Sequence, residues 1–336
     1  MKFLHICAGW EQWNGAANIA RMIMDEQVRA GHAVTSRTWA SIRKLRAADE
    51  VWIHCSWMPC LWWAALWGKK FRWMPECSYD PVRRAYHGWK KWLVGPIERF
   101  FLQRAYRIVA TCEAEKGWIE AYLGKRCPPI EVTDIKRFFN LTQAGKQVRP
   151  IFPHGNANPD SSPIPHHPSL HLLYLGRRHP LKGVDYLETA VAELNSSTPP
   201  LTTPPLLKIV SNAFGEEKEK VWEWCDVLVL PTLSENFGLV VAEALERGKR
   251  VITTDGAPAW GEGEEFGVSS FEFRVSSSGE EKDSRVERVE RVEGDELAIR
   301  VGYGGRLLYL VGYRDGSANE RVRLLKAAIA SLAVSG

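Results

Sequence analysis

Short apolar runs that look like buried strands alternate with helical patterns along this chain, and the alternation stops once and then starts again. The first series predicts a strand from residue 2, a helix over 19–29, a strand from residue 34 and further strands at 50–54 and 107–111. The second series predicts strands at 170–176, 206–211, 225–231 and 250–256, with helices over 183–194 and 237–247. Such alternation is typical of parallel sheets covered by helices on both faces. The sequence therefore predicts an α/β chain with two Rossmann-like domains facing a cleft.

The domain boundaries follow from breaks in this pattern. At 336 residues the chain exceeds the roughly 250–300 residues at which single cores stop growing. We expect an N-terminal domain at 1–145, a Pro-, Ser- and His-rich linker at 146–169, a C-terminal domain at 170–317 and a C-terminal helix at 318–336. Three copies of Arg-Val-Glu at 285–293 have an apolar residue at every third position, which suits neither a strand face nor a helix face. We interpret about 275–296 as a solvated charged insertion.

Charge and tryptophan are unevenly distributed. Residues 1–150 hold 24 Lys+Arg against 13 Asp+Glu, residues 151–336 hold 20 against 27, and twelve of the 15 Trp precede residue 119. The first half therefore suits an anionic or membrane-associated partner, and we expect no nucleic acid. The aromatic run at 57–67 is too short to span a bilayer. It is either a helix packed on the sheet or an interfacial segment whose neighbours Lys69, Lys70 and Arg72 meet anionic lipid.

The N-terminus and the cysteines indicate a cytoplasmic protein. The first ten residues look like a strand rather than a signal peptide, and the seven Cys contain no C-x-x-C spacing. Buried, reduced thiols are the simpler interpretation in a chain of this size.

The most informative segment is 225–260, where an apolar strand leads through a short turn into a helix. We expect this helix to start near Phe237 with Ser234 as its N-cap, which would make an anion site at the carboxyl edge of a parallel sheet. Glu235 and Glu243 are eight residues apart, so one carboxylate lies at the helix mouth and the other about two turns further on. Since Glu235 would repel a phosphate, it suits the hydroxyl groups of a sugar.

This segment resembles the donor-site signature of retaining glycosyltransferases of family 4, which have the GT-B fold. The residues 235–243, ENFGLVVAE, carry the E-x7-E carboxylate pair around a Phe-Gly turn. Upstream, LYLGRRHPLKG resembles the family's Gly-Arg pair followed by a Lys, here Gly176, Arg177 and Lys182. The family places such cations on the donor diphosphate.

The N-terminal half resembles the same family more loosely. NGAAN, with Gly15, is similar to the family's Gly-rich first loop, which approaches the donor phosphates or the acceptor. Relatives often carry His-Gly or Arg-Gly where this chain has Glu76 and then a Cys, so the role of the family His beside the donor sugar is lost, taken by Glu76, or supplied by His54 or His87. The helical pattern at 319–334 is a candidate for the family's helix that crosses back from the C-terminal domain.

The resemblance implies transfer of a sugar from a nucleoside diphosphate to an acceptor hydroxyl. It implies catalytic roles for Glu235 and Glu76, and it places Glu243 on the ribose. Because the sequence contains no D-x-D motif, we expect no metal and no cofactor. The remaining implied contacts to the sugar and the diphosphate come from Glu235, Asn236, Phe237 and Gly238, and from Arg177, Lys182 and Gly15.

The acceptor and the reaction class leave alternatives. Charge favours a glycan or lipid-linked glycan acceptor of bacterial lipopolysaccharide, capsule or exopolysaccharide synthesis, with peripheral contact to the inner face of an anionic membrane. The alternatives are an inactive glycosyltransferase-like protein that binds sugar nucleotides, or an epimerase or phosphorylase on the same fold.

Overall fold

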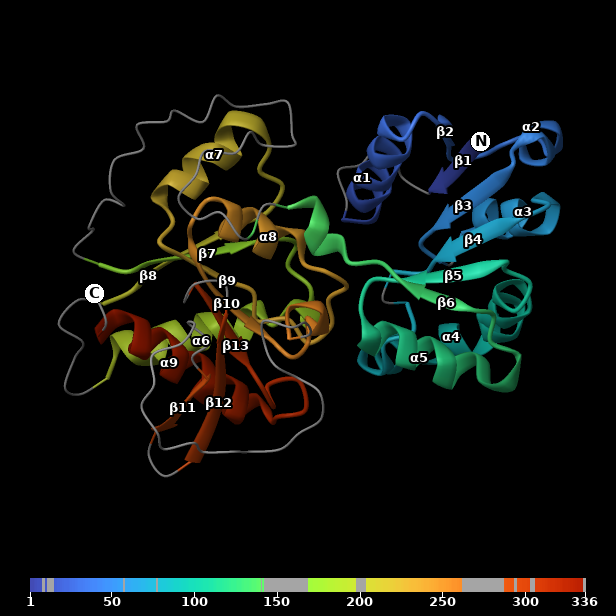
Figure 1. Cartoon of the computed structure of the whole chain (residues 1–336). Helices are drawn as coiled ribbons and strands as arrows, with labels where there is room; N and C mark the ends of the chain where they lie inside the picture. The colour runs from blue at the N-terminus through green and yellow to red at the C-terminus, as the bar shows by residue number, and fades with distance from the viewer. Residues whose placement is uncertain are drawn as a thin grey trace, which may run out of the picture. The chain divides into compact units, whose positions relative to one another are not determined.

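The computed structural model describes residues 1–7, 10, 15–56, 58–76, 78–139, 141, 169–197, 204–261, 287–292, 295–302 and 306–334. The chain divides into two compact units, Met1–Phe138 and Phe139–Gly336 (Figure 1). Apart from residue 169, the predicted linker at 146–169 lies outside the described residues.

The first unit contains a parallel sheet with the strand order β2-β1-β3-β4-β5-β6. Its strands are β1 (Lys2–Cys7), β2 (Ala33–Arg37), β3 (Glu50–His54), β4 (Phe71–Met74), β5 (Arg107–Ala110) and β6 (Ile130–Val132). Its helices are α1 (Gly15–Arg29), α2 (Ile42–Ala47), α3 (Pro59–Trp67), α4 (Pro81–Leu102) and α5 (Glu113–Leu123), with short 3-10 turns η1 (Gly124–Arg126) and η2 (Ile135–Phe138).

The two faces of this sheet carry different side chains because successive residues of a strand point to opposite faces. One face holds Leu4, Ile6, Val51, Ile53 and Trp73, which form one buried core with residues of α2, α3, α4 and α5. Figure 1 shows α1 on the other side of the sheet from α4 and α5. The residues that alternate with this core, including two buried histidines of β1 and β3, therefore face the side of α1.

The segment at 57–67 forms α3, which packs on the sheet. Cys60, Leu61, Ala64 and Ala65 of α3 belong to the core of the first unit. Two of the three cations expected to meet lipid are paired, since Lys70 Nζ lies 3.1 Å from Glu50 Oε2 and Arg72 Nε lies 2.6 Å from Glu50 Oε1, while Lys69 is exposed. Of the two alternatives expected for this segment, the structure shows the helix packed on the sheet. In the part of the chain that the structure describes, no helix combines the length and the apolar character that crossing a bilayer requires.

The second unit contains a mixed sheet with the order β11-β12-β13-β10-β9-β7-β8. The strands from β13 to β8 in this order pair in parallel, whereas β11 and β12 form an antiparallel hairpin that pairs with β13. The strands are β7 (His171–Leu175), β8 (Leu206–Val210), β9 (Val227–Val229), β10 (Arg250–Thr254), β11 (Glu287–Val292), β12 (Asp295–Gly302) and β13 (Leu307–Leu310). The helices are α6 (Val184–Asn195), α7 (Gly215–Trp224), α8 (Leu239–Glu246) and α9 (Ala318–Val334), with 3-10 turns η3 (Pro180–Lys182) and η4 (Pro258–Trp260).

The predicted α/β class with parallel-stranded sheets is thus confirmed, and one detail of the predicted insertion is corrected. The Arg-Val-Glu repeat is not simply a solvated insertion, because residues 287–292 form β11 and pair with β12 in register. A ladder of backbone hydrogen bonds does not need a period-two side-chain pattern, which is why the triplet did not reveal it. The part of the predicted insertion at 275–286 lies outside the described residues.

The predicted C-terminal helix is present as α9 and packs within the second unit. Residues of α9 contact α6 within the second unit, where Arg321 Nη1 donates to the Tyr186 hydroxyl at 3.0 Å and Lys326 Nζ lies 2.8 Å from Glu193 Oε2. Leu325 and Ile329 on the same helix are fully buried. The apolar face of α9 is therefore packed within the second unit.

Candidate active site

Two loops at the carboxyl edge of the second sheet pack against each other. Leu233 N donates to Leu181 O at 2.8 Å, which joins the loop after β9 to the loop after β7. Gly183 has a left-handed backbone at φ +63°, and a Cβ added there would lie 2.0 Å from Pro231 O. Only glycine permits this close approach of the two backbones, so Gly183 allows the two loops to pack against each other.

This packing brings Lys182 and Glu235 together. Lys182 Nζ lies 2.5 Å from Glu235 Oε2 and 3.4 Å from Ser234 O, and the two side chains are 15% and 21% exposed. The other carboxylate oxygen, Oε1, accepts from Asn236 N at 3.0 Å. The predicted diphosphate-binding Lys and sugar-binding Glu are therefore direct neighbours at one edge of the sheet, where ligands of open α/β sheets bind.

The second carboxylate of the E-x7-E pair has a partner that the sequence did not reveal. Glu243 Oε2 lies 2.6 Å from Lys218 Nζ, and the Glu243 side chain is only 14% exposed. Lys218 belongs to α7, which follows β8, the strand next to β7 in the sheet. A helix that begins after an adjacent parallel strand starts at the same edge, and this is the signal that could have identified Lys218.

The two arginines after β7 differ in their partners. Arg178 lies 3.6 Å from Asp185 Oδ1 and also pairs with Glu188 Oε1, and this pairing holds its guanidinium on the protein surface. Arg177 is exposed, and among the described residues no carboxylate is paired with it. Arg177 is therefore the arginine of this pair that is available to an anionic ligand.

The helix that carries Glu243 begins later than predicted. α8 starts at Leu239, and its N-cap is Gly238 with φ 70° and ψ 65°, so the N-cap is not Ser234 and the start is not Phe237. Ser234 is instead fully buried in the preceding loop. The turn ends at Gly238, whose left-handed backbone favours glycine. A Cβ added at this position would also lie only 3.1 Å from Leu230 Cδ2.

The side chain of Phe237 does not reach a ligand. It is 1% exposed, stacks on Phe139 with ring centroids 5.8 Å apart, and contacts the tilted ring of Trp260 at 4.9 Å. Trp260 Nε1 also donates to Phe237 O. Phe237 therefore serves the site by fixing the backbone between Asn236 and Gly238, and that backbone is the part the resemblance assigns to the sugar.

In the first unit, Glu76 lies at the end of a buried polar chain. Its Oε1 is 3.6 Å from His54 Nδ1, His54 Nε2 is 3.0 Å from His5 Nδ1, and His5 Nε2 is 2.9 Å from Gln27 Oε1. His5 and His54 are fully buried and Glu76 is 8% exposed. Sequence reasoning named Glu76 and His54 but missed His5 and Gln27. The signal for His5 was its position on the strand neighbouring β3, two residues before the carboxyl end.

The hydrogen bonds between Gln27, His5 and His54 run in one direction. Gln27 Oε1 can only accept, so His5 Nε2 carries a proton and the neutral His5 accepts at Nδ1. His54 then donates from Nε2 and presents the lone pair of Nδ1 to Glu76. Burial lowers the pKa of His54 to about 3, and burial with the neighbouring His54 lowers that of His5 to about 3, so both rings are neutral at pH 7.

Glu76 is the group that titrates near neutral pH. Burial, with a smaller contribution from the Glu115 carboxylate, raises the pKa of Glu76 to about 8, so its carboxyl is mostly protonated at pH 7. Glu76 and Cys55 also have left-handed backbones, at φ 53° and φ 68°. Such conformations in non-glycine residues cost about 1–3 kcal/mol each and tend to occur at functional sites. The Cys55 thiol donates to Glu76 Oε2 at 3.6 Å.

We expect Glu76→Gln to raise the melting temperature by roughly 2–4 °C at about pH 9 and to change it little at about pH 5. The folded pKa of about 8 lies above the unfolded value of 4.5, so the folded state binds more protons between them. The free energy of unfolding of the natural protein therefore falls as pH rises through this window, and the uncharged Gln avoids that loss. Thermal unfolding at both pH values measures it, with the exposed Glu120→Gln as control. An equal shift at both pH values would show that Glu76 does not titrate as proposed.

The other first-unit candidates, Gly15 and His87, are not members of the series from Glu76 to Gln27. Gly15 is the first residue of α1, and a Cβ added there would meet no atom of the described residues within 4 Å. His87 is exposed on α4, where its ring contacts Tyr86 at 5.4 Å. Of the two histidines proposed to replace the family His, only His54 adjoins Glu76.

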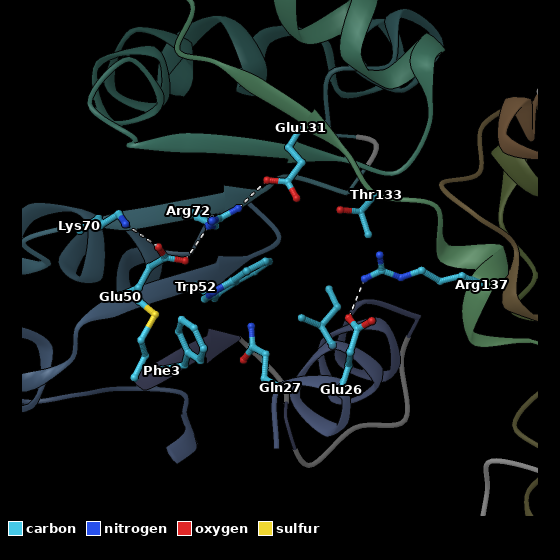
Figure 2. Close-up of a pocket in the computed structure, with 12 residues that line it drawn as sticks. Phe3, Glu26, Gln27, Glu50, Trp52, Lys70, Arg72, Glu131, Thr133 and Arg137 are labelled. Atoms are coloured by element: carbon cyan, nitrogen blue, oxygen red, sulfur yellow. Dashed lines mark hydrogen bonds and ion pairs between the residues drawn. The ribbon is translucent and has the colours of Figure 1, made fainter. Parts of the chain in front are cut away.

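A cavity of about 430 Å³ in the first unit adjoins the far end of this polar series, because Gln27 lines it (Figure 2). Its charged groups are paired with one another: Arg72 bridges Glu50 and Glu131 at 2.6 Å each, and Arg137 Nη2 lies 2.6 Å from Glu26 Oε2. The Trp52 ring lies between His5 on β1 and Arg72 on β4, at 5.6 Å and 5.2 Å. Since both flanks of this ring are occupied, the cavity offers no open stacking surface for a sugar. The lining residues are Met1, Phe3, Ile23, Glu26, Gln27, Glu50, Trp52, Lys70, Arg72, Glu131, Thr133 and Arg137.

Within the described ranges, no group of three or more His, Cys, Asp and Glu side chains is arranged to hold a metal ion.

Comparisons with known proteins agree with these observations. Residues 35–133 match the family described as glycosyl transferase 4-like domain. No curated protein matches the sequence. A structure of the Anabaena protein HepE in complex with UDP and glucose is 13% identical, with 77% of this chain and 82% of that chain covered and a TM-score of 0.50. An E. coli trehalose-6-phosphate protein bound with UDP-2-fluoro glucose is 11% identical, with 77% and 85% covered and a TM-score of 0.50. At these identities the likeness to the two structures concerns the fold.

Proposed function

We propose that this chain, a glycosyltransferase of the GT-B fold with a glycosyl transferase 4-like domain, transfers a sugar from a nucleoside diphosphate to a glycan hydroxyl with retention at the anomeric carbon. The observation that carries this proposal is the pair of Lys-Glu contacts, Lys182–Glu235 and Lys218–Glu243, beside the same edge of the second sheet. A nucleotide sugar needs cations for its diphosphate and carboxylates for its hydroxyl groups, and this edge offers both.

The roles of the second-unit residues follow from their surroundings. Arg177 and Lys182 bind the diphosphate and stabilise the charge that develops on it as the glycosidic bond breaks. Glu235 accepts hydrogen bonds from the sugar hydroxyls. The backbone of Asn236, Phe237 and Gly238 also contacts the sugar. Glu243 accepts hydrogen bonds from the ribose hydroxyls.

The first unit contributes Gly15 and Glu76 and receives the acceptor. A protonated Glu76 can donate a hydrogen bond to a sugar hydroxyl, a task that a buried carboxylate could not perform. We expect the diphosphate to be neutralised by these cations and by the start of α8 without a metal ion.

The acceptor class rests on charge. The excess of 24 Lys+Arg over 13 Asp+Glu in residues 1–150 suits an anionic glycan or lipid-linked glycan. We therefore propose a place in bacterial lipopolysaccharide, capsule or exopolysaccharide synthesis, at the cytoplasmic face of the membrane.

The function is tested by incubating the full chain with radiolabelled nucleotide sugars, beginning with UDP-glucose because two proteins of similar fold were solved with UDP and glucose or UDP-2-fluoro glucose. We expect release of the nucleoside diphosphate and a product whose anomeric configuration, measured by NMR, equals that of the donor. The same reaction with EDTA should proceed unchanged. Donor binding without turnover would instead indicate an inactive binding protein, and conversion of the donor sugar without transfer would indicate an epimerase.

A further inference from the structure

Helix α4 carries its large apolar side chains towards solvent. Trp89 and Trp92 are 70% and 80% exposed, and Leu93, Ile97 and Phe100 are also exposed. Positions 89, 93, 97 and 100 recur at three- and four-residue spacing, which places them on one face of a helix. We call these five residues the α4 aromatic face. Exposed apolar side chains normally occur singly, so a continuous row of them marks an interaction surface.

The opposite face of α4 fixes the helix in this orientation. Glu98 and Leu102 are 1% and 0% exposed, so the buried side of the helix holds a carboxylate while the exposed side holds two tryptophans. Tyr122 donates from its hydroxyl to Gly95 O at 2.8 Å, and Arg99 donates to Tyr122 O. These contacts tie α4 to α5, which lies beside it in Figure 1. The aromatic face therefore stays outside because the other face is the one that packs.

The charge around the aromatic face has one sign. Between residues 81 and 104 the chain has six Lys and Arg and a single acidic residue, Glu98, which is buried. Lys90, Arg99 and Arg104 are exposed. The surface of α4 therefore combines aromatic rings with cations and presents no acidic side chain of its own.

We propose that the α4 aromatic face binds the surface of an anionic lipid bilayer. Tryptophan favours the headgroup level of a bilayer, and cations beside an apolar face attract anionic lipid. A second copy of the chain is a poor occupant, because a symmetric contact would place the same cations against each other. The binding surface is thus α4, rather than the aromatic run that forms α3.

Flotation of the full chain with phosphatidylcholine vesicles, with and without about one third phosphatidylglycerol, tests this proposal. We expect the natural protein to bind the anionic vesicles and Trp89→Ser/Trp92→Ser to bind them roughly tenfold less. Lys90→Glu/Arg104→Glu should lose a similar amount, because each cation near an anionic surface contributes to attraction. The matched controls, Trp39→Ser and Lys125→Glu/Arg126→Glu, change exposed residues of the same kind that are not part of α4 and should bind like the natural protein.

Circular dichroism and donor hydrolysis show whether each variant is folded. Failure of the natural protein to bind anionic vesicles would overturn the proposal, as would equal losses in the α4 variants and the controls. Light scattering gives the remaining test. A dimer that dissociates in Trp89→Ser/Trp92→Ser, without vesicle binding by the natural protein, would show that the face binds a second copy.

Discussion

Lys182→Ala is expected to lower kcat/KM for sugar transfer by about 10²–10³-fold, mostly through kcat, which is the usual effect of removing one electrostatic donor from a developing charge. Lys182 Nζ is fixed by Glu235 Oε2 at 2.5 Å and by Ser234 O at 3.4 Å, so the cation is in place before the donor arrives. The leaving diphosphate gains charge as the bond to the sugar breaks, and a positioned ammonium group stabilises that state more than the bound donor. Steady-state kinetics with saturating acceptor measures the effect.

Arg178→Ala is the matched control for this variant. Arg178 lies in the same loop but pairs with Glu188 on the surface, so its removal should leave kcat within about threefold, since exposed ion pairs contribute little. Glu235→Gln combined with Lys182→Ala distinguishes a direct role from an indirect one. If Lys182 only holds Glu235 in place, the double variant will be no slower than Glu235→Gln alone, and the proposed contact to the diphosphate is then wrong.

The alternation of strands and helices could be predicted because each element has its own local residue pattern. Errors arose where the backbone conformation of a single residue, or backbone pairing alone, determines where an element begins. The start of α8 depends on the left-handed Gly238, which delays the helix until Leu239 and leaves Ser234 buried in the loop. A suitable N-cap side chain at Ser234 could not show this. The strand β11 was also missed. It forms through backbone hydrogen bonds to β12, and these do not require alternating apolar and polar side chains.

Side-chain partners from distant segments were the second source of error. Glu243 was predicted from the E-x7-E spacing, but Lys218 comes from another helix and only the neighbouring positions of β7 and β8 bring it within 2.6 Å. The exposed face of α4 illustrates the same limit. Its helical spacing is visible in the sequence, yet such an apolar stripe normally faces the core. Only the packing of Glu98 and Leu102 shows that Trp89 and Trp92 face outward.

Glu243→Gln is expected to raise the KM for the donor by about 10–100-fold and to leave kcat nearly unchanged, because hydrogen bonds to charged groups contribute roughly 1.5–3 kcal/mol each. The ribose is remote from the reacting carbon, so its contacts should be equally strong in the bound donor and in the transition state. The same substitution weakens the contact between Glu243 Oε2 and Lys218 Nζ at 2.6 Å, so a structural effect has to be separated from a binding effect.

A donor analogue without the ribose 2′- and 3′-hydroxyls makes this separation. The natural enzyme should bind the analogue far more weakly than the donor, whereas Glu243→Gln should bind both with similar KM, because the carboxylate that distinguishes them is gone. A variant that merely disturbs α8 would weaken both ligands by the same factor and keep their ratio. Glu219→Gln, an α7 carboxylate paired with Arg247 at 2.8 Å, is the matched control and should preserve both KM values. If Glu243→Gln keeps the full discrimination against the analogue, the ribose is held elsewhere and Glu243 serves only to anchor Lys218.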